Sequence, residues 1–188
     1  RTLEALGFEW DGSIQFQSDR IDDYAAAFER LQRERLTYPC RCSRAALAIT
    51  QAADPASEPV YPGICRGDPE AARGPHAWRF AVDGAGAEIE FEDAFQGACR
   101  QDCVREAGDF IVKRRDGFFA YHLAVVVDDA RDQVSEVVRG ADLLSCTPRQ
   151  ILLQRALGLP TPRYGHLPLL VEPDGQKLSK SRHALPLE

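Results

Sequence analysis

The apolar positions near the start of the chain repeat with the period of a helix. Residues 18–36 carry one apolar face, while Asp22 and Asp23 occupy what would be the first helical turn. Ser18 is a residue type that caps helix N-termini, and acidic residues in the first turn interact favourably with the helix dipole. We therefore predict a helix over residues 18–36. Its apolar face consists of Ile21, Tyr24, Phe28 and Leu31.

Alternation of apolar and polar residues, typical of strands with one face on a core, marks several other segments. Residues 88–95 alternate most clearly, with Ile89 and Phe91 on one face and glutamates on the other. The pair Asp116-Gly117 lies between two apolar segments and predicts a hairpin turn. The strands predicted in this way cover residues 78–82, 88–95, 109–114, 118–121, 134–138 and 166–171.

Two more helices are predicted in the second half of the chain. The apolar run that begins at Tyr121 does not reveal its period, and we favour a helix over a strand there. Thr147, Pro148 and Gln150 match the N-cap, first helical and capping-box positions of the next helix. Gly158 is predicted to end it.

Composition and charge limit the classes of protein that the chain can represent. Its 188 residues are 44% apolar and 28% charged, which is ordinary for a soluble protein. No segment approaches the roughly 20 apolar residues of a membrane span, so we expect a cytoplasmic protein without membrane contact. The net charge of −6 disfavours nonspecific coating of nucleic acid, so RNA contacts would need a local basic patch. The candidates for such contacts are Lys113, Arg114, Arg115, Arg149 and Arg155.

Three of the six cysteines have a spacing that suggests a metal site. In a cytosolic chain, clustered cysteines point to metal or catalysis before disulfides. Cys40 and Cys42 precede residues 52–76, a stretch whose prolines and glycines disfavour both helix and sheet, and Cys65 lies within it. A tetrahedral zinc ion would order such a stretch, and it needs one donor beyond the three thiolates. Chemistry alone favours His76 as that donor.

The remaining cysteines carry weaker signals. Cys99 and Cys103 lack a second pair nearby, and we interpret them as small buried apolar residues. Cys146 has no neighbouring base that would make it a nucleophile. A short helix is predicted between the two halves of the metal pattern, over residues 43–51.

The tail contains the motif Lys177-Leu178-Ser179-Lys180-Ser181 after a predicted turn. Lysine ammonium groups suit phosphate, and serine hydroxyls add hydrogen-bond donors. On its own, the motif is a weak signal, and a solvated lysine-serine loop is the more common explanation of such a match.

Three segments in order resemble the glutamyl branch of the class I aminoacyl-tRNA synthetases. They read RRDGFFAYHLAVVVDD, VSEVVRGADLLSCTPRQILLQRALGLPTPRYGHLPLL and KLSKS. The resemblance implies an α/β fold, a Rossmann-like catalytic domain that is incomplete here and carries a small zinc-bearing insertion. It implies catalytic segments at 1–37 and 109–188, with the insertion and connecting strands at 38–108. The implied activity is activation of glutamate with ATP and Mg²⁺.

The resemblance also assigns roles to individual residues. Lys180 would be catalytic and would bind the ATP triphosphate, with Lys177 as a second ATP contact. Tyr121 and Arg139 match the positions that bind glutamate, although Arg139 also suits a structural salt bridge with Asp142 or Glu136, and Tyr121 suits a core position. The pair at 128 and 129 is interpreted as a helix-ending polar pair that organises nearby basic groups.

The metal pattern resembles small members of this branch that glutamylate the queuosine base of tRNA(Asp). In those proteins a Cys-x-Cys and a Tyr-x-x-x-Cys pattern bind zinc, which here assigns Cys40, Cys42, Tyr61 and Cys65. His76 or water stays open as the fourth ligand. The implied partners are glutamate, ATP and tRNA(Asp), and we expect a monomer.

The two ends of the chain add expectations. The chain starts at Arg1 without a HIGH-type motif, so we expect that motif upstream and expect the segment alone to be inactive. It ends seven residues after Ser181, which leaves no room for an anticodon-binding domain. The alternatives are a truncated core of a glutamyl-tRNA synthetase that charges tRNA(Glu), or a non-catalytic zinc-dependent RNA-binding module.

Overall fold

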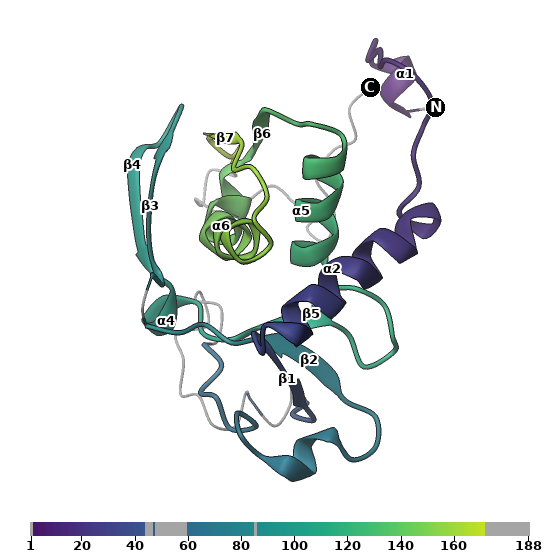
Figure 1. Ribbon diagram of the computed structural model, residues 1–188. Helices are drawn as coiled ribbons and strands as arrows, with labels where there is room; N and C mark the ends of the chain where they lie inside the picture. Colours follow the sequence, from purple (N-terminus) through teal and green to yellow (C-terminus); the bar gives the residue numbers. More distant parts are fainter. Residues whose placement is uncertain (1, 44–46, 48–59, 85, 172–188) are drawn as a thin grey trace.

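The computed structural model describes residues 2–43, 47, 60–84 and 86–171. Figure 1 labels its helices and strands in chain order. The helices are α1 (Thr2–Ala5), η1 (Gln17–Arg20), α2 (Ile21–Arg33), η2 (Pro69–Ala72), α4 (Cys103–Glu106), α5 (Tyr121–Arg131), η3 (Ala141–Cys146) and α6 (Thr147–Ala156). The strands are β1 (Thr37–Cys40), β2 (Ala77–Phe80), β3 (Glu88–Asp93), β4 (Gly97–Asp102), β5 (Phe110–Lys113), β6 (Glu136–Gly140) and β7 (Arg163–Leu167).

The described strands form two sheets of different character. One has the order β1-β2-β5 and is antiparallel throughout. The other has the order β4-β3-β7-β6, in which β3, β7 and β6 run parallel and β4 pairs antiparallel with β3. Residues 38–108 contribute strands to both sheets. In Figure 1 the long β3-β4 hairpin stands on one side of α6, and the β1-β2-β5 sheet lies below α2 and α5.

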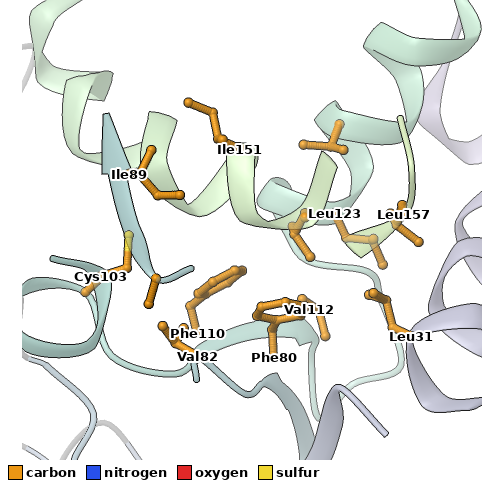
Figure 2. Packing of buried hydrophobic residues seen from close by; sticks show 14 of the residues in the cluster. Leu31, Phe80, Val82, Ile89, Cys103, Phe110, Val112, Leu123, Ile151 and Leu157 are labelled. Carbon is orange, nitrogen blue, oxygen red and sulfur yellow. The ribbon is translucent and has the colours of Figure 1, made fainter. Parts of the chain in front are cut away.

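The largest hydrophobic core lies between the antiparallel sheet and the helices α5 and α6. Figure 2 shows Leu123 and Ile151, from these helices, on the side opposite Phe80 and Phe110 of the sheet. The two phenylalanine rings stack with 5.3 Å between their centroids. Leu31 joins this core from α2 and is fully buried. Burial of these side chains therefore fixes both sheets and three helices around one interior.

The three longer helices occur where the sequence pattern predicts them, but two predicted caps are wrong. Helix α2 begins after a 3₁₀ turn, and the Ser18 hydroxyl donates to Asp19 instead of capping the helix backbone. Helix α6 begins without a side-chain cap, because the Thr147 hydroxyl is engaged by Arg139 and His166. Gly158 ends α6 with a φ of 58°, a left-handed conformation that glycine adopts easily.

Five of the six predicted strands are confirmed with shifted ends. In β3, Ile89 is buried while its glutamates are exposed, as alternation predicts. Strand β4 was missed, because its sequence GACRQD has no apolar alternation. Strand β7 begins and ends earlier than predicted. The prediction followed the apolar residues up to 171, but Pro168 has no N–H that could continue the ladder. The segment 118–121 makes one bridge, between Phe119 and Lys113, instead of a strand.

Some predicted features lie outside the described residues. These are most of the helix predicted at 43–51, the turn at 173–175 and the lysine-serine motif at 177–181. Within the described chain, no helix is both long enough and apolar enough to cross a membrane.

Asp128 joins α5 to α2, as expected of a polar pair that organises basic groups. Its carboxylate accepts hydrogen bonds from the Tyr24 hydroxyl at 2.8 Å and from the Arg20 guanidinium at 3.1 Å. The same guanidinium forms two hydrogen bonds with Asp132 one turn later, at 2.8 and 2.9 Å. This contact is structural, because it fixes the start of α2 against α5.

Candidate functional site

The parallel strands end together at one edge of their sheet. Asp93 is the last residue of β3, Arg139 precedes the last residue of β6, and His166 precedes the last residue of β7. Helix α5 begins at Tyr121 and helix α6 begins at Thr147. Both residues are hydrogen-bonded to Arg139, so both helices begin beside the same edge. Ligands of α/β proteins bind at the carboxyl ends of parallel strands, where helix N-termini favour negative charge.

Arg139 is the centre of this cluster and donates to four side chains. Its Nε lies 3.0 Å from Nε2 of His166. Its Nη2 donates to Thr147 at 2.7 Å and to Gln150 at 2.9 Å. Its Nη1 lies 3.4 Å from the hydroxyl of Tyr121. None of these four hydrogen bonds reaches Glu136 or Asp142, and Glu136 pairs with Arg163 instead.

His166 connects Arg139 to a buried carboxylate. Its Nδ1 lies 2.5 Å from Oδ2 of Asp93, and both side chains are fully enclosed. Burial alone would raise the pKa of Asp93, but hydrogen bonds from His166, Gln96 and Phe95 outweigh it and hold that pKa well below its usual range. Asp93 is therefore ionised, and its carboxylate accepts a hydrogen bond from Nδ1–H of His166.

None of the four hydrogen bonds of Arg139 goes to a carboxylate. Its charge does act on Asp129: burial and then Asp128 raise the pKa of that carboxyl group, and Arg139 partly offsets the rise. The four partners of Arg139 are an imidazole, a hydroxyl, an amide oxygen and a phenol, all of them uncharged when they accept its hydrogen bonds. Tyr121 is 48% exposed, so its hydroxyl and Nη1 of Arg139 face outward together. Such an arrangement has the hydrogen-bond donors and the positive charge that suit a carboxylate ligand.

The second cluster brings three cysteine sulfurs together near β1. The Sγ atoms of Cys40, Cys42 and Cys65 all lie within 4.8 Å of one another. The Tyr61 hydroxyl is 3.4 Å from the sulfur of Cys40 and 3.7 Å from that of Cys42. Zinc bonds of about 2.3 Å to sulfur and 2.0 Å to oxygen place tetrahedral ligands about 3.5 to 3.8 Å apart. The four side chains thus fit the size of a zinc site.

Backbone packing brings Tyr61 to the sulfurs. Gly108 forms a bridge with Tyr61, and a Cβ atom at this glycine would lie 2.9 Å from the Tyr61 backbone. The φ of Gly108 is 61°, which also favours glycine. The backbone N–H of Cys65 donates to the Tyr61 hydroxyl at 2.9 Å, which fixes the phenol oxygen beside the cysteines.

His76 does not join these ligands. Its Nδ1 is hydrogen-bonded to the carbonyl oxygen of Gly74 at 2.8 Å, and its ring packs edge-on against Trp78.

Burial raises the pKa of the Tyr61 phenol, and the cysteine contacts raise it further, so the phenol is protonated without a cation. A dication at the cluster would reverse that preference.

Arg79 supplies positive charge to the cysteine cluster. Its Nε lies 3.2 Å from the sulfur of Cys40, and its guanidinium carbon lies 3.7 Å from the centroid of the Tyr61 ring. Its Nη1 donates to the backbone oxygen of Asp109 at 2.7 Å, which holds it in place.

The other candidate residues are spread over the molecule. Lys113 lies 5.1 Å from the ring centroids of Phe28 and Phe119, Arg114 pairs with Asp116, and Arg115 donates to the backbone oxygen of residue 41. Arg149 is buried and bonded to a backbone carbonyl, which makes it inaccessible to RNA. Of the other cysteines, Cys103 is buried, as expected, whereas Cys99 is only half-buried, contrary to the prediction; Cys146 is buried as well. Lys177 and Lys180 lie outside the described residues.

Comparison with known proteins defines the class to which these features belong. Residues 1–187 match the family described as tRNA synthetases class I (E and Q), catalytic domain, and the chain belongs to that family. This confirms the resemblance in the sequence.

The most informative relatives carry one name. The chain is 50% identical over 186 residues to the glutamyl-Q tRNA(Asp) synthetase of Pseudomonas aeruginosa (strain LESB58), covering 99% of the chain and 60% of the relative. It is 51% identical over 189 residues to the protein of that name from Geobacter sulfurreducens, covering 100% of the chain and 60% of the relative. The chain thus spans about 60% of the length of these relatives.

Solved structures confirm the fold. A glutamate tRNA ligase from Elizabethkingia meningosepticum, solved in complex with its amino acid, matches with a TM-score of 0.76 at 23% identity, over 98% of this chain and 42% of that one. The glutamate-tRNA synthetase of Elizabethkingia anophelis matches with a TM-score of 0.71 at 24% identity, over 88% of this chain and 36% of that one. The predicted α/β class is therefore that of a class I tRNA synthetase catalytic domain.

Proposed function

We propose that the full-length protein activates glutamate with ATP and transfers it to the queuosine base of tRNA(Asp). The observation that carries the glutamate assignment is the cluster around Arg139, whose positive charge has only uncharged hydrogen-bond partners. The name shared by relatives at about half identity supports tRNA(Asp) as the acceptor.

Tyr121 and Arg139 are the proposed glutamate ligands. Nη1 of Arg139 and the Tyr121 hydroxyl together present hydrogen-bond donors to one carboxylate. Glutamate carries two carboxylates, and the one held here leaves the other to attack the α-phosphorus of ATP. Because the substrate itself is the nucleophile, the protein contributes position and charge more than a general base.

Lys180 and Lys177 are the proposed ATP ligands in the second half of the chain. Negative charge grows on the pyrophosphate as glutamate attacks, so a lysine held there stabilises the transition state more than the ground state. We propose that Mg²⁺ accompanies ATP in a Rossmann-like domain.

Cys40, Cys42, Cys65 and Tyr61 are the proposed zinc ligands. A closed tetrahedral zinc site orders the segment that carries its ligands and has no open position for catalysis. Arg79 offsets part of the negative charge that the ligands retain. We assign this zinc a structural role within residues 38–108.

The remaining parts of the proposal concern partners and location. A splayed anticodon base is an RNA element that proteins recognise well, and such a base is the proposed acceptor. ATP and tRNA are cytoplasmic substrates, and we propose a cytoplasmic monomer.

The proposal is tested by glutamate transfer. The full-length protein is incubated with ATP, labelled glutamate and tRNA(Asp) that contains either queuosine or guanosine at the wobble position. We expect labelling of the queuosine form only. Labelling of tRNA(Glu) would instead identify a glutamyl-tRNA synthetase, and binding of RNA without transfer would identify a non-catalytic module.

A further inference from the structure

We infer that Asp93 and His166 are positioning residues that fix the orientation of Arg139 and direct a single nitrogen, Nη1, toward the substrate carboxylate. The inference rests on the proposed function in one respect, that the ligand of Arg139 is the carboxylate of glutamate. It assigns a role to two buried residues that do not touch the ligand themselves.

The chain of hydrogen bonds begins at Asp93. Its Oδ1 accepts three backbone N–H groups, those of Phe95, Gln96 and His166, each at 3.0 Å. Its Oδ2 faces Nδ1 of His166. Backbone amides can only donate, so Oδ1 must remain an acceptor and only Oδ2 is available to select the tautomer of the histidine.

The tautomer of His166 then sets the role of its second nitrogen. A carboxylate at Oδ2 requires the proton on Nδ1, which leaves Nε2 as an acceptor. Nε2 faces Nε of Arg139 at 3.0 Å and the Thr147 hydroxyl at 3.2 Å, both of which can donate. The hydrogen-bonding direction is therefore consistent from Asp93 through His166 to Arg139.

Arg139 is thereby held along one edge of its guanidinium group. His166 occupies Nε, while Thr147 and Gln150 occupy Nη2. Both of the latter residues are buried and lie in the first turn of α6, so they cannot follow a moving arginine. The edge formed by Nε and Nη2, which often binds a carboxylate through two hydrogen bonds, is thus occupied by protein groups. The substrate carboxylate therefore contacts Nη1 and the Tyr121 hydroxyl.

The variant Asp93→Asn tests this direction of hydrogen bonding. Its amide oxygen must take the place of Oδ1, because three N–H groups face it. Its NH₂ group then faces Nδ1 of His166 and forces the proton to Nε2, so that a donor faces the Nε–H of Arg139. We expect the KM for glutamate of the full-length protein to rise roughly ten- to one-hundredfold, with the KM for ATP unchanged.

Two substitutions of His166 form a matched pair. In His166→Gln the longer side chain places an amide oxygen near the former Nε2, where it accepts from Arg139; in His166→Asn the shorter side chain reaches only Asp93. We expect His166→Gln to keep most of the glutamate affinity and His166→Asn to lose it. A purely structural role of His166 would make the two variants equally defective. If Asp93→Asn does not fold, the comparison of these two variants tests the inference in its place.

The assay is glutamate-dependent ATP–pyrophosphate exchange, with thermal unfolding as the measure of folding. A wild-type protein without such exchange contradicts the proposed function. Suppose that the wild type shows exchange and that Arg139→Ala loses it. A wild-type glutamate KM in folded Asp93→Asn and in both His166 variants would then overturn only the positioning role. An effect of Asp93→Asn that disappears in the Arg139→Ala background, measured by glutamate binding, supports the role.

Discussion

The two clusters of this molecule have opposite unmatched charges. The cysteine cluster places three thiols and a phenol within reach of one point, and it needs a cation to hold their ionised forms together. The cluster at the ends of β6 and β7 surrounds Arg139 with uncharged acceptors, and it needs an anion. The first is enclosed and suits a resident metal; the second faces outward at Tyr121 and suits a substrate.

The clusters also differ in what organises them. The cysteine cluster depends on ligands from one short stretch of chain, positions 40 to 65. The arginine cluster depends on positions 93 to 166, which only the parallel sheet and two helix N-termini bring together. Substitutions in the first cluster therefore should affect local folding, and substitutions in the second should affect ligand binding.

The largest effect is expected from Cys40→Ser. Loss of one thiolate from a closed tetrahedral site removes much of an apparent binding free energy on the order of 10 kcal/mol. We expect zinc content to fall from one ion per chain to nearly none, measured by metal analysis of the purified full-length protein. Cys99→Ser is the matched control, because this half-buried cysteine lies outside the cluster. Unchanged zinc content in Cys40→Ser would rule out the proposed ligand set.

Arg139→Lys is expected to have the next largest effect. Lysine keeps the charge but cannot donate to His166, Thr147 and Gln150 at once, so the KM for glutamate should rise roughly a hundredfold. The matched control is Arg163→Lys, whose side chain is 79% exposed in a surface pair with Glu136. Equal effects of the two substitutions on the glutamate KM would contradict the account of the site.

Tyr61→Phe should weaken zinc binding without abolishing it. Water can replace the phenol oxygen, so we expect the zinc dissociation constant to rise about tenfold or more in a competition assay with a chelator. Tyr38→Phe is the control, since this buried tyrosine in the same hydrophobic cluster donates to Asp109 instead of approaching the cysteines. If His76→Ala weakened binding and Tyr61→Phe did not, histidine would be the fourth ligand.

The smallest predicted effect concerns His122 beside the arginine cluster. Burial, and then the charges of Arg149 and Arg139, lower the pKa of His122 to about 4. A folded-state pKa below the unfolded value means that the unfolded chain binds more protons, so stability falls as pH drops from about 6.5 towards 4. This group should lower the unfolding free energy by about 1 kcal/mol between about pH 7 and 5.5.

The matched variant His122→Phe isolates that contribution. Phenylalanine cannot titrate, and it can keep the edge-on contact with Phe110. Chemical denaturation of the full-length protein at both pH values should show a smaller loss of stability in the variant. An identical loss in wild type and variant would show that the positive surroundings do not act on His122.

The sequence predicts some features of the fold and site better than others, for physical reasons. The helix that contains Phe28 and the alternation at Ile89 follow from local periodicity, and the cysteine spacing is a local signal as well. Asp93, His166, Thr147 and Gln150 were not predicted as partners of Arg139. Their proximity depends on strand register for the first two and on the placement of α6 for the other two. The pairing of residue 139 with residue 166 in β6 and β7 is what places them side by side.

One available signal was the position of these residues within their elements. Asp93, Arg139 and His166 each lie at the carboxyl end of a strand, where parallel sheets place their ligands. The strand ends predicted from sequence were displaced, since β7 was placed three residues too late at its start, 166 instead of 163. With the strand ends displaced, the sequence alone did not indicate that Asp93, Arg139 and His166 lie at the same edge of the sheet.

Glutamate-dependent ATP–pyrophosphate exchange by the full-length protein tests the central claim, that the cluster around Arg139 selects a carboxylate substrate, most directly. The account predicts exchange that saturates with glutamate and is at least about tenfold less efficient with glutamine, whose neutral amide does not supply the missing charge. Equal exchange with both amino acids, or none with glutamate, would contradict it.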